Sequence, residues 1–199
     1  AFENQPKITK WNLAKFAECI IPLIDKNEKK SIKIATNTIN NFEKIYEAKW
    51  LNMMRDKLGL FGKDKNDKKL IFDLLSWMEN NKVDFTNTFC HLMNIETGYK
   101  KIYKDQNFSN WVEKWKKRLL EKSNSIEECF KLMRKVNPII IPRNHKVEEA
   151  LKAANQGNLD PMVKLLNFIK DPYNDDENSS SYKTPLPIGG ERYQTFCGT

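Results

Sequence analysis

Residues 6–25 read PKITKWNLAKFAECIIPLID, and this stretch indicates which kind of structure the chain forms. Its apolar residues recur at steps of three and four positions, which is the spacing that gives an α-helix one apolar face. They are Ile8, Trp11, Phe16, Cys19, Ile20 and Leu23. Pro22 stands near the end of the pattern, as expected close to the end of a helix. The stretch therefore predicts an amphipathic helix.

The same spacing returns along most of the chain. Residues 34–60, IATNTINNFEKIYEAKWLNMMRDKLGL, predict one long helix that stops at Gly59 and Gly62. Further helices are predicted at residues 65–80, 83–95, 107–122, 125–136, 145–156 and 159–170. No segment alternates apolar and polar residues for long, so the chain is predicted to be all-α.

Several helix starts carry a residue that commonly caps a helix. Asn66 or Asp67 precedes the helix at 65–80, Asp84 or Thr86 begins the next, and Asp160 stands before Pro161 at the last. Residues 171–187, DPYNDDENSSSYKTPLP, then predict an extended linker to the tail RYQTFCGT at 192–199.

Composition restricts the class of protein. The chain has 199 residues with a hydrophobic fraction of 40% and a charged fraction of 30%, which favour a soluble globular body without a membrane span. Its first residues contain neither an initiator Met nor an apolar signal segment, so we expect a piece of a longer protein. Four separated cysteines argue against a disulfide framework and favour a reducing compartment.

The net charge of +8 raises the possibility of nucleic-acid binding. Lysines alternate with acidic residues in most segments, and only EKWKKRLLEK at 113–122 is locally dense, so a solvated helix face is favoured and nucleic acid is an unlikely partner. An alternative stays open, in which the chain is a basic helical binding module for an acidic partner or nucleic acid.

No catalytic, cofactor-binding or metal-binding residue is expected in this chain. The glycines form no phosphate-binding loop, and His91 and His145 stand far apart without a zinc-binding spacing. Cys90 or His91 is predicted to pack near the edge of the core, while Cys19 and Cys129 are predicted to be buried and unreactive. The five tryptophans are predicted to pack in the core: Trp11, Trp50, Trp77, Trp111 and Trp115.

The stretch VNPIIIPRNHKVEEAL at 136–151 is the strongest candidate for a site within the chain. Its two prolines are expected to hold the isoleucine run extended, and Asn144 is expected to cap the next helix. Arg143 suits either a carboxylate clamp or a surface charge. Arg143, Asn144 and His145 are therefore candidates for a structural or a site role, and both possibilities stay open.

Six motifs in order carry a resemblance to a known family. They are FENQPKITKWNLAKFAECIIPLI (2–24), MRDKLGL (54–60), DFTNTF (84–89), NPIIIPRNHKVEEALKAANQGN (137–158), LLNFIKDPY (165–173) and YQTFCGT (193–199). Together they resemble the C-terminal part of the selenoprotein O family, the YdiU-like proteins. The resemblance covers essentially the whole chain.

The resemblance implies a pseudokinase with a protein-kinase-like fold that acts as a protein adenylyltransferase. Such a protein binds ATP and Mg²⁺ and transfers AMP to a Ser, Thr or Tyr hydroxyl of a protein substrate. The catalytic, nucleotide and metal residues precede the NQP motif in the family, so this segment alone is expected to be inactive and to need the N-terminal kinase-like portion as its partner.

The resemblance also implies three regions. Residues 1–106 correspond to helices of the kinase-like C-lobe, residues 107–173 to a helical C-terminal extension, and residues 174–199 to a linker and a redox-type tail. Cys197 matches the position of a tail cysteine or selenocysteine, and the implied role is a redox latch to a cysteine upstream of Ala1. Family members occur in mitochondria and in the bacterial cytoplasm, so the compartment is mitochondrial for a eukaryotic source and cytoplasmic for a bacterial one.

Overall fold

The structure is a computed structural model that describes residues 4–95, 101–123 and 125–185. All regular elements within these ranges are helical, which confirms the predicted all-α class. The chain forms two compact units: unit 1 covers residues 1–54 and unit 2 covers residues 55–199.

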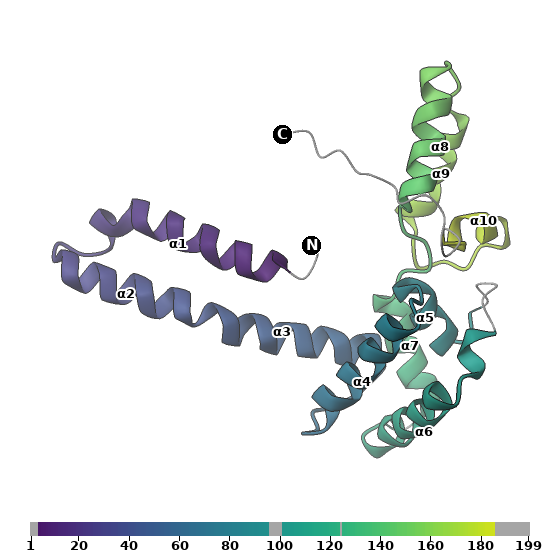
Figure 1. Cartoon of the computed structure of the whole chain (residues 1–199), viewed down its shortest axis with the longest axis horizontal. Helices are drawn as coiled ribbons and strands as arrows, with labels where there is room; N and C mark the ends of the chain where they lie inside the picture. The colour runs from purple at the N-terminus through teal and green to yellow at the C-terminus, as the bar shows by residue number, and fades with distance from the viewer. Residues whose placement is uncertain (1–3, 96–100, 124, 186–199) are drawn as a thin grey trace. The chain divides into compact units, whose positions relative to one another are not determined.

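Unit 1 is built from α1 (Gln5–Ile24), α2 (Glu28–Asn40) and most of α3 (Phe42–Lys57). Figure 1 shows α1 and α2 side by side, joined by a short turn. The side chain of Asn27 accepts a hydrogen bond from the backbone N–H of Lys30 and so caps α2. Lys10 of α1 reaches Glu43 of α3 at 2.8 Å.

The predicted single helix at 34–60 is wrong, because this region forms the end of α2 and all of α3. Asn41 separates the two helices, and its N–H is shared between carbonyls of the preceding turn. Asn40 and Asn41 are weak helix formers in succession, which favours a break at this point. The Asn27 cap starts α2 six residues earlier than the apolar pattern indicates.

Burial in unit 1 is slight. Of the described residues 4–54, only Ser31 and Met54 are buried. Helix α1 has no buried residue at all. Unit 1 therefore forms helices without enclosing a core of its own.

Unit 2 encloses a core between α4 (Asp67–Asn80), α5 (Phe85–Leu92), η2 (Ile102–Lys104), α6 (Gln106–Glu121) and α7 (Ile126–Val136). The buried side chains include Leu58, Ile71, Leu74, Phe89, Phe108, Trp111, Trp115, Leu119 and Met133. The indole N–H of Trp111 donates to the carbonyl of Leu70, and that of Trp115 donates to Leu58, both at 2.8 Å. The predicted burial of Trp111 and Trp115 is confirmed.

Gly59 turns the chain from α3 into this core. Its φ of +68° is in the left-handed region that favours glycine. The N–H of Leu60 bonds to the carbonyl of Arg55 and the N–H of Gly59 to that of Asp56, which is the paired ending typical of a Schellman motif. The predicted stop at Gly59 is confirmed.

The rest of unit 2 is a helical hairpin and a short terminal helix. Helices α8 (Asn144–Asn155) and α9 (Asp160–Lys170) lie side by side (Figure 1). The isoleucine run before α8 is non-helical but bends at Ile139, so it is not extended throughout as predicted, and Ile139 and Ile140 both donate backbone N–H groups to the carbonyl of Pro172. The start of α9 differs by one residue, because Leu159 takes the N-cap position predicted for Asp160.

Part of the predicted linker is folded. Residues 177–179 form the 3₁₀ helix η3 (Glu177–Ser179), which runs into α10 (Ser180–Lys183). Asp176 caps η3 through its side chain, and Lys183 is buried and forms an ion pair with Asp175. The acidic residues that suggested a solvated spacer thus serve as local caps and partners. The tail at 192–199 lies outside the described residues.

Candidate functional site

Arg143 lies at the centre of a polar network in unit 2. It occupies the N-cap position of α8, and its side chain is directed to the N-terminus of α5. Nη1 donates to Oδ2 of Asp84 at 2.7 Å and Nη2 donates to Oδ1 at 3.0 Å, so the guanidinium binds the carboxylate with both arms. Asp84 also accepts from the backbone N–H of Asn87, as the cap of α5.

Asn87 extends this network to the end of the described chain. Its Oδ1 accepts from Nη2 of Arg143 at 3.1 Å, and its Nδ2 donates to the backbone carbonyl of Lys183 at 3.1 Å. Asn87 and Arg143 are both buried. The network of Asp84, Asn87, Arg143 and Lys183 therefore ties α5, α8 and α10 together.

The network restricts what Arg143 can do chemically. Both of its terminal nitrogens are engaged within the chain, Nη1 with Asp84 and Nη2 with Asp84 and Asn87. Within the described chain, Nε of Arg143 is buried and has no hydrogen-bond partner. The arrangement is that of a carboxylate clamp inside the chain.

Asn144 and His145 are placed differently from Arg143. Asn144 is exposed as the first residue of α8 and does not cap it, because Arg143 holds the N-cap position, so the expected Asn144 cap is wrong. His145 is half-buried, and its pKa lies below the ordinary value because burial and the nearby Lys146 disfavour its charged form.

A second charged cluster lies around Asp67 at the start of α4. Asn66 or Asp67 is expected to cap this helix, and the structure places Asn66 at the N-cap position and Asp67 inside the cluster. Oδ2 of Asp67 accepts from Nε of Arg55 at 2.6 Å, and Oδ1 accepts from Nε of Arg118 at 2.8 Å. Burial alone would raise the pKa of Asp67, but hydrogen bonds from Arg118 and Arg55 lower it overall. The three residues are far apart in sequence, so no local signal identifies the cluster.

Lys57 is half-buried and Cys90 is buried in unit 2. Nζ of Lys57 donates to Oδ1 of Asn137 at 3.2 Å and lies over the rings of Phe85 and Phe89. Burial lowers the pKa of Lys57 and raises the pKa of the Cys90 thiol to about 12. Cys90 is fully buried in the core, while His91 is half-buried and takes the predicted place near its edge. A buried thiol of this kind is a poor nucleophile at neutral pH.

Two predictions for unit 1 are wrong. Trp11 is 59% exposed, and Cys19 is exposed as well, although both lie on the apolar side of α1. The spacing identified the face of the helix correctly, but unit 1 itself places no core against that face. Cys129, on α7, is buried as predicted. Cys197 lies outside the described residues.

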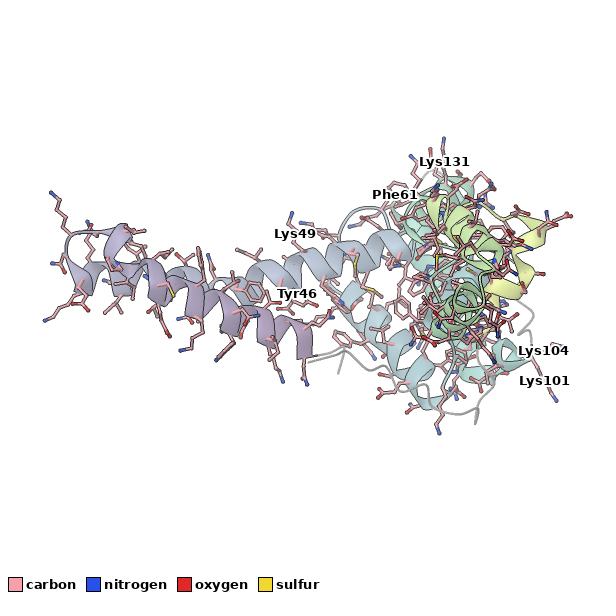
Figure 2. All side chains as sticks on the ribbon, turned by 90° about the horizontal axis from the view of Figure 1, so that it is seen from above. Tyr46, Lys49, Phe61, Lys101, Lys104 and Lys131 are labelled. Atoms are coloured by element: carbon pink, nitrogen blue, oxygen red, sulfur yellow. The ribbon has the colours of Figure 1, made fainter. Side chains whose placement is uncertain are left out.

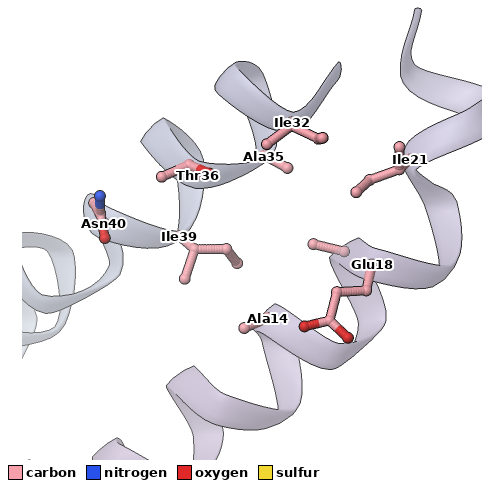
Figure 3. A pocket seen from close by; sticks show the side chains of 9 residues that line it. Ala14, Glu18, Ile21, Ile32, Ala35, Thr36, Ile39 and Asn40 are labelled. Carbon is pink, nitrogen blue, oxygen red and sulfur yellow. The ribbon is translucent and has the colours of Figure 1, made fainter. Parts of the chain in front are cut away.

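Unit 1 contains a shallow groove of about 290 Å³ between α1 and α2. Figure 3 shows Ile21 of α1 and Ile32 and Ile39 of α2 pointing toward this space. Small side chains such as Ala14 and Ala35 line the facing surfaces and leave the gap open. The lining is mostly apolar, with Glu18, Thr36 and Asn40 as its polar members.

Neither a metal site nor a membrane span is found in the described ranges. No three His, Cys, Asp or Glu side chains come together there as metal ligands. No helix of this part is both long and apolar enough to cross a bilayer. Figure 2 shows Lys131 on one side of unit 2 and Lys101 and Lys104 on another, so these exposed lysines do not form one basic patch.

Comparison with known proteins gives matches along the whole chain. A family model described as protein adenylyltransferase SelO matches residues 1–170. The chain is 52% identical to the "Protein nucleotidyltransferase YdiU" of Pelagibacter ubique, 45% to that of Clostridium botulinum and 42% to that of Nitrosococcus oceani. Each alignment covers 100% of this chain but only 41% of the relative, so the chain spans less than half the length of these curated relatives.

Proposed function

Because the chain belongs to the SelO family of protein adenylyltransferases, we propose that it is the helical C-terminal part of an enzyme that transfers AMP to proteins. The observation that carries this proposal is the family match over residues 1–170, together with 52% identity to a protein nucleotidyltransferase. In the proposed reaction, the hydroxyl oxygen of a Ser, Thr or Tyr bonds to the α-phosphorus of ATP. The bond to the bridging oxygen breaks, pyrophosphate leaves, and the hydroxyl proton passes to a base outside this chain.

This chain contributes structure to the proposed enzyme. Its sequence has no glycine-rich phosphate loop, and its buried arginines bind carboxylates within the chain: Arg143 binds Asp84, and Arg118 binds Asp67. ATP and Mg²⁺ are accordingly assigned to the part of the enzyme that this chain does not contain. The helices of unit 2 supply a core that is enclosed within this chain.

A redox latch at Cys197 belongs to the same proposal. The thiols of Cys197 and of a cysteine outside this chain would lose two electrons and two protons to a disulfide oxidant such as oxidised glutathione. A sulfur–sulfur bond forms between the two cysteines, and glutathione leaves as two thiols. Cys197 stands in the tail motif YQTFCGT, the position at which the family resemblance places the latch cysteine.

The proposed activity is tested with a chimera in which this chain replaces the matched segment of the Pelagibacter ubique relative. The chimera is incubated with Mg²⁺ and ATP labelled at the α-phosphate, and protein-bound label is measured. We expect label on the chimera or on added bacterial proteins, and no label with this chain alone. ATP labelled at the γ-phosphate is the control.

Three results would contradict the proposal. Protein-bound label from the γ-phosphate would indicate phosphoryl transfer in place of AMP transfer. Labelling by this chain alone would place the nucleotide site within these 199 residues. An unlabelled chimera, beside a Pelagibacter ubique relative that does transfer AMP, would show that this chain cannot support the reaction.

A further inference from the structure

The outer face of α1 is an apolar stripe that no described part of unit 1 covers. Its members are Ile8 (56% exposed), Trp11 (59%), Phe16 (62%), Leu23 (83%) and the exposed Cys19. At 3.6 residues per turn, these five positions fall within an arc of about 140° on the helix, which also contains the exposed Asn12 and Lys15. The five apolar residues are called the α1 stripe below.

The opposite face of α1 is also apolar. Ala14, Ala17 and Ile21 line the groove against α2, as Figure 3 shows for Ala14 and Ile21. With the α1 stripe, apolar residues therefore occupy two sides of the same helix. A helix with apolar residues on two opposite sides can pack against two neighbours at once, as helices inside a larger domain do.

The burial pattern of unit 1 agrees with this interpretation. Ser31 and Met54 are its only buried residues within 4–54, so burial inside unit 1 contributes little to the stability of its helices. A unit of about this size normally needs a core, metal or disulfide to stay folded. An exposed stripe with Trp, Phe, Leu and Ile at successive turns marks an interaction surface.

The comparisons indicate what covers the stripe. The family match includes α1, and more than half of each curated relative lies outside the matched segment. Such a relative has enough additional chain to bury the stripe. The exposed side chains of Trp11, Phe16 and Leu23 are all large and apolar. The surface that covers them is therefore expected to be apolar as well.

We propose that the α1 stripe is the surface on which the remaining part of the family protein packs, with Trp11 and Phe16 as its main anchors. This inference rests on the proposed function, because that function supplies the longer enzyme. The stripe thereby joins the helical part described here to the part assigned to ATP binding. Its apolar character implies a permanent contact within one enzyme.

Cys19 provides a direct test, because it lies in the middle of the stripe. Alkylation by iodoacetamide is followed at Cys19 by peptide mapping, first in this chain alone and then in the Pelagibacter ubique chimera. We expect fast labelling in the chain alone and labelling slower by roughly tenfold or more in the chimera, since a covered thiol reacts only when the contact opens. Equal rates in both proteins would overturn the proposal.

A matched pair of substitutions tests the surface without relying on the thiol. Ile8→Lys and Leu120→Lys each place a charge at a position that is 56% exposed, one on the α1 stripe and one on α6. In the chain alone we expect neither to change the melting temperature. In the chimera, Ile8→Lys should lower it by several degrees more than Leu120→Lys, because only the stripe becomes buried.

Other occupants give different results, each of which would contradict the proposal. Slow labelling of Cys19 in the chain alone at every concentration would mean that unit 2 covers the stripe. Slow labelling only at high concentration would indicate a second copy. Failure of the proposed function is distinguishable, because a chimera that protects Cys19 but transfers no AMP retains the contact and loses only the activity.

Discussion

Trp11 and Trp115 show how the two units of this protein differ. Both stand at helical spacing among apolar residues, and both are predicted from the sequence to lie in the core. Trp115 is 2% exposed and its indole N–H is bonded to Leu58, whereas Trp11 is 59% exposed. The spacing identifies a helix and its apolar face, but it does not say whether the partner of that face is in the same chain.

The largest expected effect comes from replacing these two tryptophans. Trp115→Ala should lower the free energy of unfolding of unit 2 by about 3–5 kcal/mol through the cavity it leaves. The unpaired carbonyl of Leu58 adds to this loss. Trp11→Ala should change the stability of the chain alone by less than about 0.5 kcal/mol, because its side chain is already solvated.

The free energy of unfolding of both variants is measured by urea unfolding of the chain, followed by circular dichroism. A Trp11→Ala loss as large as that of Trp115→Ala would remove the difference between the units. It would show that Trp11 is buried within this chain in solution.

The next effect concerns the charged cluster around Asp67. Asp67→Asn leaves the guanidinium groups of Arg55 and Arg118 without their common carboxylate in a buried site, and should cost about 3 kcal/mol. Asp73→Asn on the same helix removes an exposed partner of Lys69 and should cost at most about 0.5 kcal/mol. The same urea experiment compares them, and equal losses would contradict the assignment of Asp67 to the core.

A smaller effect is expected at the glycine that ends α3. A Cβ on Gly59 would lie 2.8 Å from the backbone oxygen of Cys129, at a φ of +68°. Gly157 has a φ of +84°, but a Cβ at this position would meet no tertiary contact within 4 Å in the described chain. Gly59→Ala should therefore cost about 2 kcal/mol and Gly157→Ala about 1 kcal/mol.

Thermal melting of the two alanine variants separates the close contact from the backbone strain. If Gly157→Ala destabilised the chain as much as Gly59→Ala, the close approach of Gly59 to Cys129 on α7 would add nothing to the backbone strain.

The smallest expected effect is the contribution of His91 to the pH dependence of stability. Burial lowers the pKa of this histidine, whose ring stacks on Tyr103 at 3.9 Å. The unfolded chain therefore takes up the proton first, so the stabilising contribution is present above about pH 6.5 and declines as the pH falls through that value. His91→Gln should weaken the decline between about pH 7 and 5, and an unchanged pH profile would contradict this account.

The sequence predicts the helices of unit 2 well because their apolar periodicity and their partners are both within the chain. Asp84 is recognisable as a helix start, and the structure shows it as the cap of α5. The break at Asn41 is not predictable in the same way, because the apolar pattern continues across it. The domain boundaries near residues 106 and 173 stay predictions.

The candidate site is predictable only in part. Arg143 is recognisable from the sequence as a possible carboxylate clamp, but its partner Asp84 lies 59 positions away, and no local pattern links the two. The same holds for Asp67 and Arg118. Such pairs depend on how helices pack, which a periodic pattern does not specify.

Hydrogen–deuterium exchange tests most directly whether unit 2 holds its own core while the apolar face of unit 1 needs the rest of the enzyme. In the chain alone, we expect backbone amides of α1 to exchange quickly and those of α6 to exchange slowly. In the Pelagibacter ubique chimera, α1 should become protected while α6 stays as it was. Slow exchange of α1 in the chain alone, or fast exchange of α1 in the chimera, would contradict the account.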